Sequence, residues 1–353
     1  MLTDYRLYKE DVAYTAALEL PWEKLQDQVF MISGASGLLA SFLIDVLMEK
    51  NRTEQLNCRL IALVRDEEKA KKRFAAYLED PCFSIHACDI NRRETLPEEK
   101  QVDYILHAAS NTHPVAYATD PIGTVTTNII GTDNLLNFAA EHGCRRFAFA
   151  SSNEIYGENR GDAELFDEKY CGYIDSNTMR AGYPESKRCG EALCQAYIRQ
   201  KGLDCVIPRF TRSYGPSMLM SDTKAISQFI RKGIAGEDIV LKSAGTQYYS
   251  YTYVSDAVAG FLTVLLKGEC GEAYNIADVR SDIMLKDLAA EIAEIAGKQV
   301  IFEIPDAVEQ AGYSTATKAR LDGTKLQKLG WNARYSMREG LERTITTLRE
   351  MAE

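Results

Sequence analysis

A tyrosine and a lysine four residues apart, Tyr183 and Lys187, have the types and spacing to do chemistry. The run from Glu185 to Gln200 is typical of a helix, and residues four apart on a helix share one face. An ammonium group near a phenol favours the phenolate and lowers the pKa of the tyrosine. A tyrosine tuned in this way can transfer a proton at neutral pH. Because the same spacing is common on surface helices, the rest of the chain has to decide between catalysis and chance.

The overall composition is ordinary for a globular protein. The chain has 353 residues, of which 46% are hydrophobic and 26% charged, enough for one large α/β unit with a lobe or for two domains. The formal net charge of −10 argues against non-specific nucleic-acid binding, which needs a basic surface. The polar N-terminus, residues 1–11, lacks the apolar core of a signal peptide. No stretch reaches ~18 uninterrupted apolar residues, so we expect no membrane partner.

Nine cysteines and four histidines occur, and neither set has the spacing of a metal site. The number of cysteines is odd, their spacing is irregular, and there is no C-x-x-C pair. This pattern fits reduced thiols in the cytoplasm better than a disulfide framework or a zinc site. The sequence therefore predicts a cytoplasmic protein that binds no metal.

A glycine-rich turn lies between a predicted strand and a predicted helix near the N-terminus. The apolar run Val29–Ile32 fits a buried strand, and residues 38–50 have apolar pairs at helical spacing. The turn between them has the spacing Gly34-x-x-Gly37-x-x-Ala40. Glycines there allow a tight turn and a close approach to a pyrophosphate, which the helix N-terminus attracts. We expect cofactor contacts from Gly34, Ser36, Gly37 and Leu38.

The next two predicted strands end in residues that could meet an adenosine. Residues 60–64 form the second strand, which ends at Arg65 and Asp66. An acidic residue there would bond the ribose 2′-hydroxyl of NAD, whereas an arginine suits the 2′-phosphate of NADP. Arg65 favours NADP and Asp66 keeps NAD possible, although Arg65 could equally begin a charged surface helix. After the third strand, residues 83–87, Asp89 and Ile90 would lie beside the adenine.

Small and polar residues follow the fourth and fifth predicted strands, residues 104–107 and 147–150. The fourth ends in His107, which we interpret as structural, and leads into Ala108, Ala109 and Ser110. The fifth leads into the polar segment 151–157. Ligands of open α/β sheets bind at the carboxyl ends of the strands. These two segments are therefore expected to line the site.

Strand–helix alternation continues to a sixth strand, residues 203–209, and then weakens. Later helices are expected at 226–235, 255–267, 285–296 and 341–351, and later strands at 239–241, 251–254, 274–276 and 300–304. The pattern predicts an α/β fold, a Rossmann-like doubly wound parallel sheet with a smaller, interleaved C-terminal substrate lobe. The expected domains are an N-terminal helical extension (1–28), an NAD(P)-binding Rossmann domain (29–212, also receiving 248–278) and a substrate-binding lobe (213–247 and 279–353).

Together these residues resemble the extended short-chain dehydrogenase/reductase superfamily and, within it, the NAD-dependent epimerase/dehydratase family that acts on nucleotide sugars. The likeness extends from about Val29 to Trp331. Its closest local form is the UDP-glucuronate decarboxylase branch, in residues 180–188 and Glu154. The motifs that carry it are Gly34-x-x-Gly37-x-x-Ala40, Asp89-Ile90, His107-Ala108-Ala109, Asn128 with Gly131-Thr132, residues 151–157, Tyr183-x-x-x-Lys187, Tyr214-Gly215-Pro216, Tyr253-Val254-x-Asp256 and Leu329-Gly330-Trp331.

The resemblance implies a role for each residue of the expected site. Tyr183 would be the acid/base on a sugar hydroxyl, usually at C4, and Ser152 would bond the same oxygen. Lys187 would hold the nicotinamide ribose and lower the pKa of the tyrosine. Glu154 matches a base of the 4,6-dehydratases that the decarboxylases also carry. Hydride transfer from the sugar to the nicotinamide would leave a ketone, which opens epimerisation, elimination or decarboxylation. The family also implies substrate contacts from Ser110 and Arg180, and a homodimer formed through helices near 128–142 and 184–200.

Three positions depart from the family pattern. Asn153 stands in the catalytic group where dehydratases have an aspartate and decarboxylases a serine, and an amide cannot act as a proton-donating acid. Arg212 replaces an asparagine that contacts the nucleotide diphosphate. Tyr249 replaces an arginine that clamps the same group. Either Arg212 supplies the missing charge from the other wall, with both residues binding substrate, or the substrate is not a standard UDP- or dTDP-sugar.

These observations favour an NAD(P)-dependent enzyme that acts on a nucleotide sugar as an epimerase or a decarboxylase. A net NAD(P)H-dependent reductase of an activated keto-sugar is the alternative, favoured by Arg65 and Asn153. A non-catalytic nucleotide-binding regulator on the same fold is the alternative from another class. Such proteins typically lose one member of the Tyr–Lys pair, and both are present here.

Overall fold

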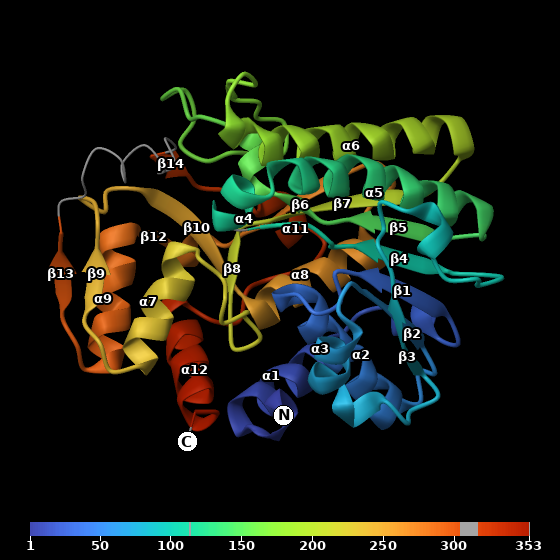
Figure 1. Cartoon of the computed structure of the whole chain (residues 1–353), viewed down its shortest axis with the longest axis horizontal. Helices are drawn as coiled ribbons and strands as arrows, with labels where there is room; N and C mark the ends of the chain where they lie inside the picture. Colours follow the sequence, from blue (N-terminus) through green and yellow to red (C-terminus); the bar gives the residue numbers. More distant parts are fainter. Residues whose placement is uncertain (113, 304–316, 353) are drawn as a thin grey trace.

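The computed structural model describes residues 1–112, 114–303 and 317–352 and shows a parallel sheet between two layers of helices (Figure 1). The strand order is β11-β7-β5-β4-β1-β2-β3, with β6 beside β7. From β1 the chain builds outward first on one side and then on the other, so the predicted doubly wound fold is confirmed. The strands are β1 (Val29–Ser33), β2 (Arg59–Val64), β3 (Phe83–Ala87), β4 (Tyr104–His107), β5 (Arg146–Phe149), β6 (Ser151–Ser152), β7 (Cys205–Phe210) and β11 (Ala273–Ile276).

Successive residues of the strands pack in two separate hydrophobic cores, one on each face of the sheet. Phe30 and Ile32 of β1 pack in the core that includes the second helix, whereas Met31 packs in the other core. Because both faces are covered, these strands read as continuous apolar runs. In Figure 1, α5 and α6 cover one face, and α2 and α8 the other. The covering helices are α2 (Leu38–Glu54), α3 (Glu67–Arg73), α5 (Pro121–Glu141), α6 (Gly182–Lys201) and α8 (Val254–Lys267).

Helix α5 begins earlier than the sequence pattern suggested, at Pro121 instead of residue 128. The Asp120 carboxylate accepts a hydrogen bond from the Gly123 amide at 3.0 Å. A capping aspartate followed by proline at the first helical position is a strong start signal. The apolar periodicity used for the prediction begins only about two turns later, which explains the difference.

A smaller lobe is built around β10 (Tyr248–Tyr253), which pairs with strands from three other parts of the chain. Within the range 248–278, β11 lies in the main sheet and α8 packs against β7, whereas β10 pairs with strands of a separate sheet. Position 304 of the expected strand 300–304 lies outside the described residues. The other lobe elements are β8 (Arg212–Tyr214), α7 (Ala225–Ile234), β9 (Ile239–Leu241), β12 (Asp282–Met284), α9 (Leu285–Ala296), β13 (Val300–Phe302), β14 (Lys318–Ala319), α11 (Thr324–Gln327) and α12 (Met337–Glu350).

The N-terminal helix α1 (Arg6–Ala16) packs against α2, α8 and α12. Its Asp11 side chain is fully buried and accepts hydrogen bonds from the hydroxyls of Tyr253, at 2.6 Å, and Tyr335, at 2.7 Å. The guanidinium of Arg343 on α12 completes the cluster at 2.9 Å. The first helix is therefore joined to the C-terminal part of the chain by buried polar contacts.

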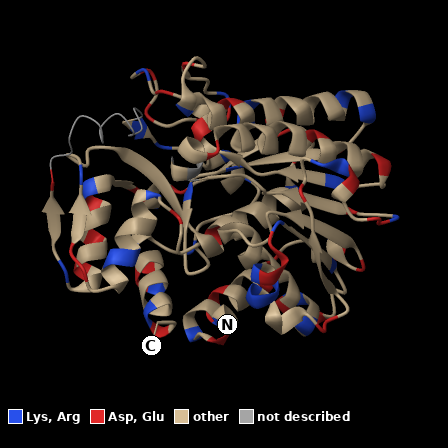
Figure 2. Cartoon of the chain, in the orientation of Figure 1, with Lys and Arg blue, Asp and Glu red and all other residues tan. Residues whose placement is uncertain are grey.

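Short 3-10 turns connect several elements. Figure 2 shows that basic and acidic residues are interspersed along the helices. All nine cysteines are free thiols. In the described part of the chain, no cluster of histidine, cysteine or acidic residues could hold a metal, and no helix is long and apolar enough to cross a membrane. The 3-10 turns are η1 (Leu2–Asp4), η2 (Trp22–Leu25), η3 (Ala75–Tyr77), η4 (Arg93–Thr95), η5 (Asn153–Tyr156), η6 (Met179–Ala181) and η7 (Val279–Ser281).

Candidate active site

The first turns of α6 bring Tyr183 and Lys187 to the carboxyl end of β5. Both lie in the helix, which begins at Gly182, and both side chains are buried. The Lys187 amine donates a hydrogen bond to the carbonyl of Ala150 at 2.8 Å and lies 4.8 Å from the ring centroid of Phe149. The Ser152 hydroxyl forms a hydrogen bond with that of Tyr183. The structure therefore brings the expected Tyr, Lys and Ser together.

The pKa of Tyr183 is raised. The prediction that Lys187 lowers this pKa is therefore wrong. Burial is the main cause, because the phenolate loses its hydration, and the nearby Glu154 carboxylate adds to it. The hydrogen bond with Ser152 and the charge of Arg180 oppose the rise. Burial also lowers the pKa of Lys187 to about 7, against an opposing effect of Glu191 and Cys194. Proton transfer by Tyr183 therefore needs additional positive charge, or the loss of the Glu154 charge.

An ion pair and an aromatic stack cover the Tyr183 ring. Arg180, in the turn before α6, donates to the Glu154 carboxylate at 2.8 Å. Its guanidinium lies 4.9 Å from the ring centroid of Tyr117, and the Tyr117 ring stacks on Tyr183 with centroids 4.9 Å apart. Tyr117 belongs to α4 (Pro114–Thr119), which lies between the main sheet and the smaller lobe (Figure 1). Sequence reasoning missed Tyr117, since its only signal was its place in the connection after β4.

Asn153 and Glu154 form the turn η5 directly after β6. Asn153 is buried, and the backbone amide of Glu154 donates to the Ser152 hydroxyl at 3.2 Å. The two positions that distinguish the branches of the resembled family thus lie beside the serine that bonds Tyr183. Position 153 supplies an amide and position 154 a carboxylate, so these two positions supply one acidic group between them.

The glycine turn has the geometry that a pyrophosphate site requires. Gly34 has φ +69°, and a Cβ there would lie 2.7–2.8 Å from the backbone of Ala108 and Ala109. Gly37 is the N-cap of α2, and no side chain caps that end of the helix. The amides of the first turn therefore point at the site with no side-chain partner, which fits an anionic phosphate of NAD(P).

The other two expected contacts in the glycine turn, Ser36 and Leu38, flank Gly37 in sequence. Ser36 and Leu38 are half-buried. The Leu38 carbonyl accepts a hydrogen bond from the Ser217 hydroxyl at 3.0 Å, a contact that the sequence did not predict. It joins the glycine turn to the segment after β8.

The expected adenosine contacts lie at the ends of β2 and β3. Arg65 and Asp66 are exposed, and Asp66 caps α3 by accepting from the Lys69 amide at 3.1 Å. Because α3 begins at Glu67, Arg65 precedes that helix and stands at the strand end. Asp89 is exposed and accepts from the amide of Asn91 at 3.0 Å.

Two more expected contacts lie near the same edge of the sheet. Ile90 is buried against Gly131 of α5, where a Cβ would come within 2.7 Å of it. Ser110, after β4, is half-buried and donates to the Asn111 carbonyl at 3.2 Å.

Two of the residues that depart from the family pattern, Arg212 and Tyr249, contact one another. The guanidinium of Arg212 on β8 lies 3.6 Å from the ring centroid of Tyr249 on β10. This is a cation–π contact. One Arg212 nitrogen, Nη1, is buried with no hydrogen-bond partner in the described structure. The pair therefore places a cation with unused donor capacity inside the lobe.

Comparison with known proteins agrees with this geometry. Residues 30–277 match the model of the NAD dependent epimerase/dehydratase family. UDP-glucuronic acid decarboxylase 5 of Arabidopsis thaliana is 31% identical over 317 residues, covering 88% of this chain and 86% of the relative. UDP-glucuronic acid decarboxylase 1 of Xenopus tropicalis is 30% identical, covering 92% and 72%.

Two solved structures share the fold. The DesIV dTDP-glucose 4,6-dehydratase of Streptomyces venezuelae has a TM-score of 0.78 at 24% identity, covering 92% of this chain and 97% of that one. The UDP-glucose 4-epimerase of Thermotoga maritima has a TM-score of 0.78 at 23% identity, covering 92% and 100%. The predicted family and the prediction of an enzyme are thereby confirmed: this chain belongs to the NAD dependent epimerase/dehydratase family.

Proposed function

We propose that this protein is an NAD-dependent enzyme that oxidises a nucleotide-linked hexuronic acid at a sugar hydroxyl, at C4 as is usual in the family, and decarboxylates it. The observation that carries the proposal is Arg180, a cation held beside Tyr183 by one carboxylate and one aromatic ring. A substrate carboxylate could pair with the remaining guanidinium N–H groups. The names of the relatives, UDP-glucuronic acid decarboxylases, support the same substrate class.

The side chains divide the acid–base work. Tyr183 would take the proton of the sugar hydroxyl, and Ser152 would donate a hydrogen bond to the same oxygen. When bound, NAD would supply a hydride acceptor for the sugar carbon and return the hydride later. Lys187 would hold the cofactor ribose. The glycine turn, with Gly34 and Gly37, would hold the pyrophosphate.

Decarboxylation suits the acid–base groups of this site better than dehydration does. A C4 ketone lies β to the C6 carboxylate, so loss of CO2 leaves its bonding electrons in an enolate that the ketone stabilises. That step needs no acid at position 153. Elimination of water would need a proton donor for the leaving hydroxide, and the amide of Asn153 cannot act as one.

The test uses the purified full chain. Small molecules released from it should include NAD, and UDP-glucuronic acid should give CO2 and a UDP-pentose, detected by mass spectrometry. Tyr183→Phe should lower turnover by about 10²–10⁴-fold and leave NAD affinity intact. Tyr173→Phe, an exposed tyrosine, is the matched control. The proposal fails if neither NAD nor NADP binds, or if Tyr183→Phe turns over normally.

A net reductase of an activated keto-sugar is the second function to test. Arg65 at the end of β2 and the missing acid at Asn153 favour it. A reductase would consume NAD(P)H in proportion to product, whereas a decarboxylase or epimerase would recycle bound NAD. A non-catalytic regulator would bind the nucleotide and turn over none of the nucleotide sugars.

Four further expectations accompany the proposal. Arg65 would favour NADP if its guanidinium meets the 2′-phosphate. We expect a homodimer through α5 and α6, which pack side by side and expose Ile122 and Ile130, and light scattering measures its mass. We also expect a cytoplasmic location. Arg212 with Tyr249, together with Ser110, would contact the nucleotide diphosphate or the sugar.

A further inference from the structure

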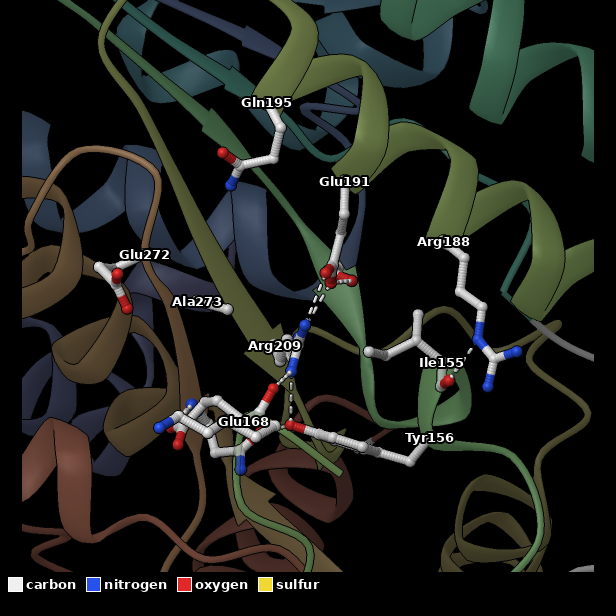
Figure 3. A network of polar contacts seen from close by, with 12 residues as sticks. Ile155, Tyr156, Glu168, Arg188, Glu191, Gln195, Arg209, Glu272 and Ala273 are labelled. Atoms are coloured by element: carbon white, nitrogen blue, oxygen red, sulfur yellow. Dashed lines mark hydrogen bonds and ion pairs between the residues drawn. The ribbon is translucent and has the colours of Figure 1, made fainter. Parts of the chain in front are cut away.

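Glu191 lies one helical turn after Lys187 on α6 and points to the sheet (Figure 3). There it meets Arg209 of β7 in a two-pronged ion pair, with N–O distances of 2.9 and 2.6 Å. The exposed fractions of the two side chains are only 14% and 9%. Paired geometry of this kind fixes the carboxylate in position.

Lys187 and Glu191 hold two adjacent residues, Ala150 and Ser151, at the start of the strand β6 that carries Ser152. The Lys187 amine donates to the carbonyl of Ala150 at 2.8 Å, and the Ser151 hydroxyl donates to the Glu191 carboxylate at 2.5 Å. Ser152 follows directly. The ammonium and the carboxylate therefore approach the same short segment from the same face of α6.

Arg209 is itself held from the opposite side. One of its nitrogens, Nη1, donates to the Tyr156 hydroxyl at 2.9 Å and to the carbonyl of Glu168 at 2.8 Å. Figure 3 shows Arg209 between Glu191 and Tyr156, with Glu168 at its end. The Tyr156 hydroxyl donates in turn to Asn275 of β11 at 2.5 Å. This network leaves the Glu191 carboxylate little freedom to turn away from the helix.

The groups that face Lys187 include one anion. From α6 these are Glu191 and the thiol of Cys194. From β4, His107 is buried and hydrogen-bonded at both nitrogens, and burial with the charge of Lys187 lowers its pKa to about 3. It is therefore neutral at physiological pH. From β5 come the Phe149 ring and the Ala150 carbonyl. Arg209 lies behind Glu191. Among these described groups, the Glu191 carboxylate alone carries negative charge.

We propose that Glu191 is a positioning residue of this site: the buried counter-charge, held by Arg209, that favours the protonated form of Lys187 where it meets the cofactor. The inference rests on the proposed function, because it assumes that Lys187 contacts NAD. Burial has already brought the pKa of Lys187 to about 7, with Glu191 the first of the groups opposing it. Loss of the carboxylate would lower the pKa of Lys187 further and reduce its protonated fraction at pH 7.

The test is the pH dependence of NAD affinity, measured by calorimetry from pH 5.5 to 9.5. Lys187→Met identifies the inflection that belongs to Lys187 by removing it. Glu191→Gln keeps the shape of the side chain and should move that inflection to lower pH by about one unit or more. Ser151→Ala removes the hydrogen bond and leaves both charges, so its inflection should stay at the wild-type pH.

A second variant covers the case in which Glu191→Gln does not fold. The double variant Glu191→Gln/Arg209→Gln leaves no unpaired buried charge and should shift the inflection in the same direction. Circular dichroism checks the fold of each variant.

The possible outcomes separate this inference from the proposed function. A folded Glu191→Gln or double variant whose inflection stays at the wild-type pH overturns the inference. So does a shift in Ser151→Ala as large as that in Glu191→Gln, since the effect would then come from strand position. Absence of NAD and NADP binding in the wild type overturns the proposed function first.

Discussion

The buried carboxylate of Asp11 allows a quantitative test of how the N-terminal helix is held. It accepts hydrogen bonds from two tyrosine hydroxyls and forms an ion pair with the guanidinium of Arg343. All three partners lie more than 200 residues away in sequence. Asp11→Asn keeps an acceptor oxygen but removes the charge. Asp11→Ala removes every contact and leaves Arg343, 16% exposed, without its buried partner.

The expected loss follows from these contacts. Removing one member of a buried ion pair costs about 3–5 kcal/mol, and a buried hydroxyl left without an acceptor costs about 1–3 kcal/mol. The effects are not additive, because all three donors share one carboxylate. We expect Asp11→Ala to lower the free energy of unfolding by about 4–7 kcal/mol and Asp11→Asn by about 2–4 kcal/mol.

Urea unfolding is the assay, followed by circular dichroism and by fluorescence of Trp22 and Trp331, which are both buried. Coincidence of the two signals checks two-state behaviour. Glu10→Gln is the matched control, because Glu10 is the neighbouring, exposed acid that also reaches Arg343, at 3.3 Å. It should change stability by less than about 0.5 kcal/mol. The reasoning is refuted if Asp11→Asn is no less stable than Glu10→Gln.

Three further predictions concern the cofactor side of the site. Folding lowers the pKa of Lys187 to about 7 from 10.5, so the unfolded chain binds more protons between those values and stability rises with pH there. Without NAD, Lys187→Met should therefore melt at a higher temperature than wild type at pH 7, with a smaller difference at pH 9.5; an equal difference at both would contradict this. Gly34→Ala should destabilise the protein and weaken NAD binding, because its Cβ would meet the Ala109 amide at 2.7 Å. Gly143→Ala, at the same φ but in open space, is its control, and equal melting temperatures would contradict the packing argument. Arg65→Ala should weaken NADP binding more than NAD binding in calorimetry, and an unchanged ratio of the two dissociation constants would exclude Arg65 as a 2′-phosphate contact.

Local sequence patterns determined the fold and much of the site. The apolar runs 29–32 and 60–64 predicted buried parallel strands because such strands are covered on both faces. The spacing of Gly34 and Gly37 between a strand and a helix predicted the turn, since its geometry depends on a few adjacent residues. The Tyr183–Lys187 spacing predicted a shared helix face, because a helix has a fixed period. The resemblance to a family, carried by these motifs, was confirmed.

Only the tertiary structure decided which distant residues meet and how they titrate. Tyr117 stacks on Tyr183, and Arg180 holds Glu154, across separations that no local period encodes. The pKa of Tyr183 was expected to fall and instead rises, because burial and the Glu154 carboxylate outweigh the opposing effects of Ser152 and Arg180. Glu191 shows the same division: its place four residues after Lys187 is local, but its fixed carboxylate depends on Arg209, which the sheet brings beside it.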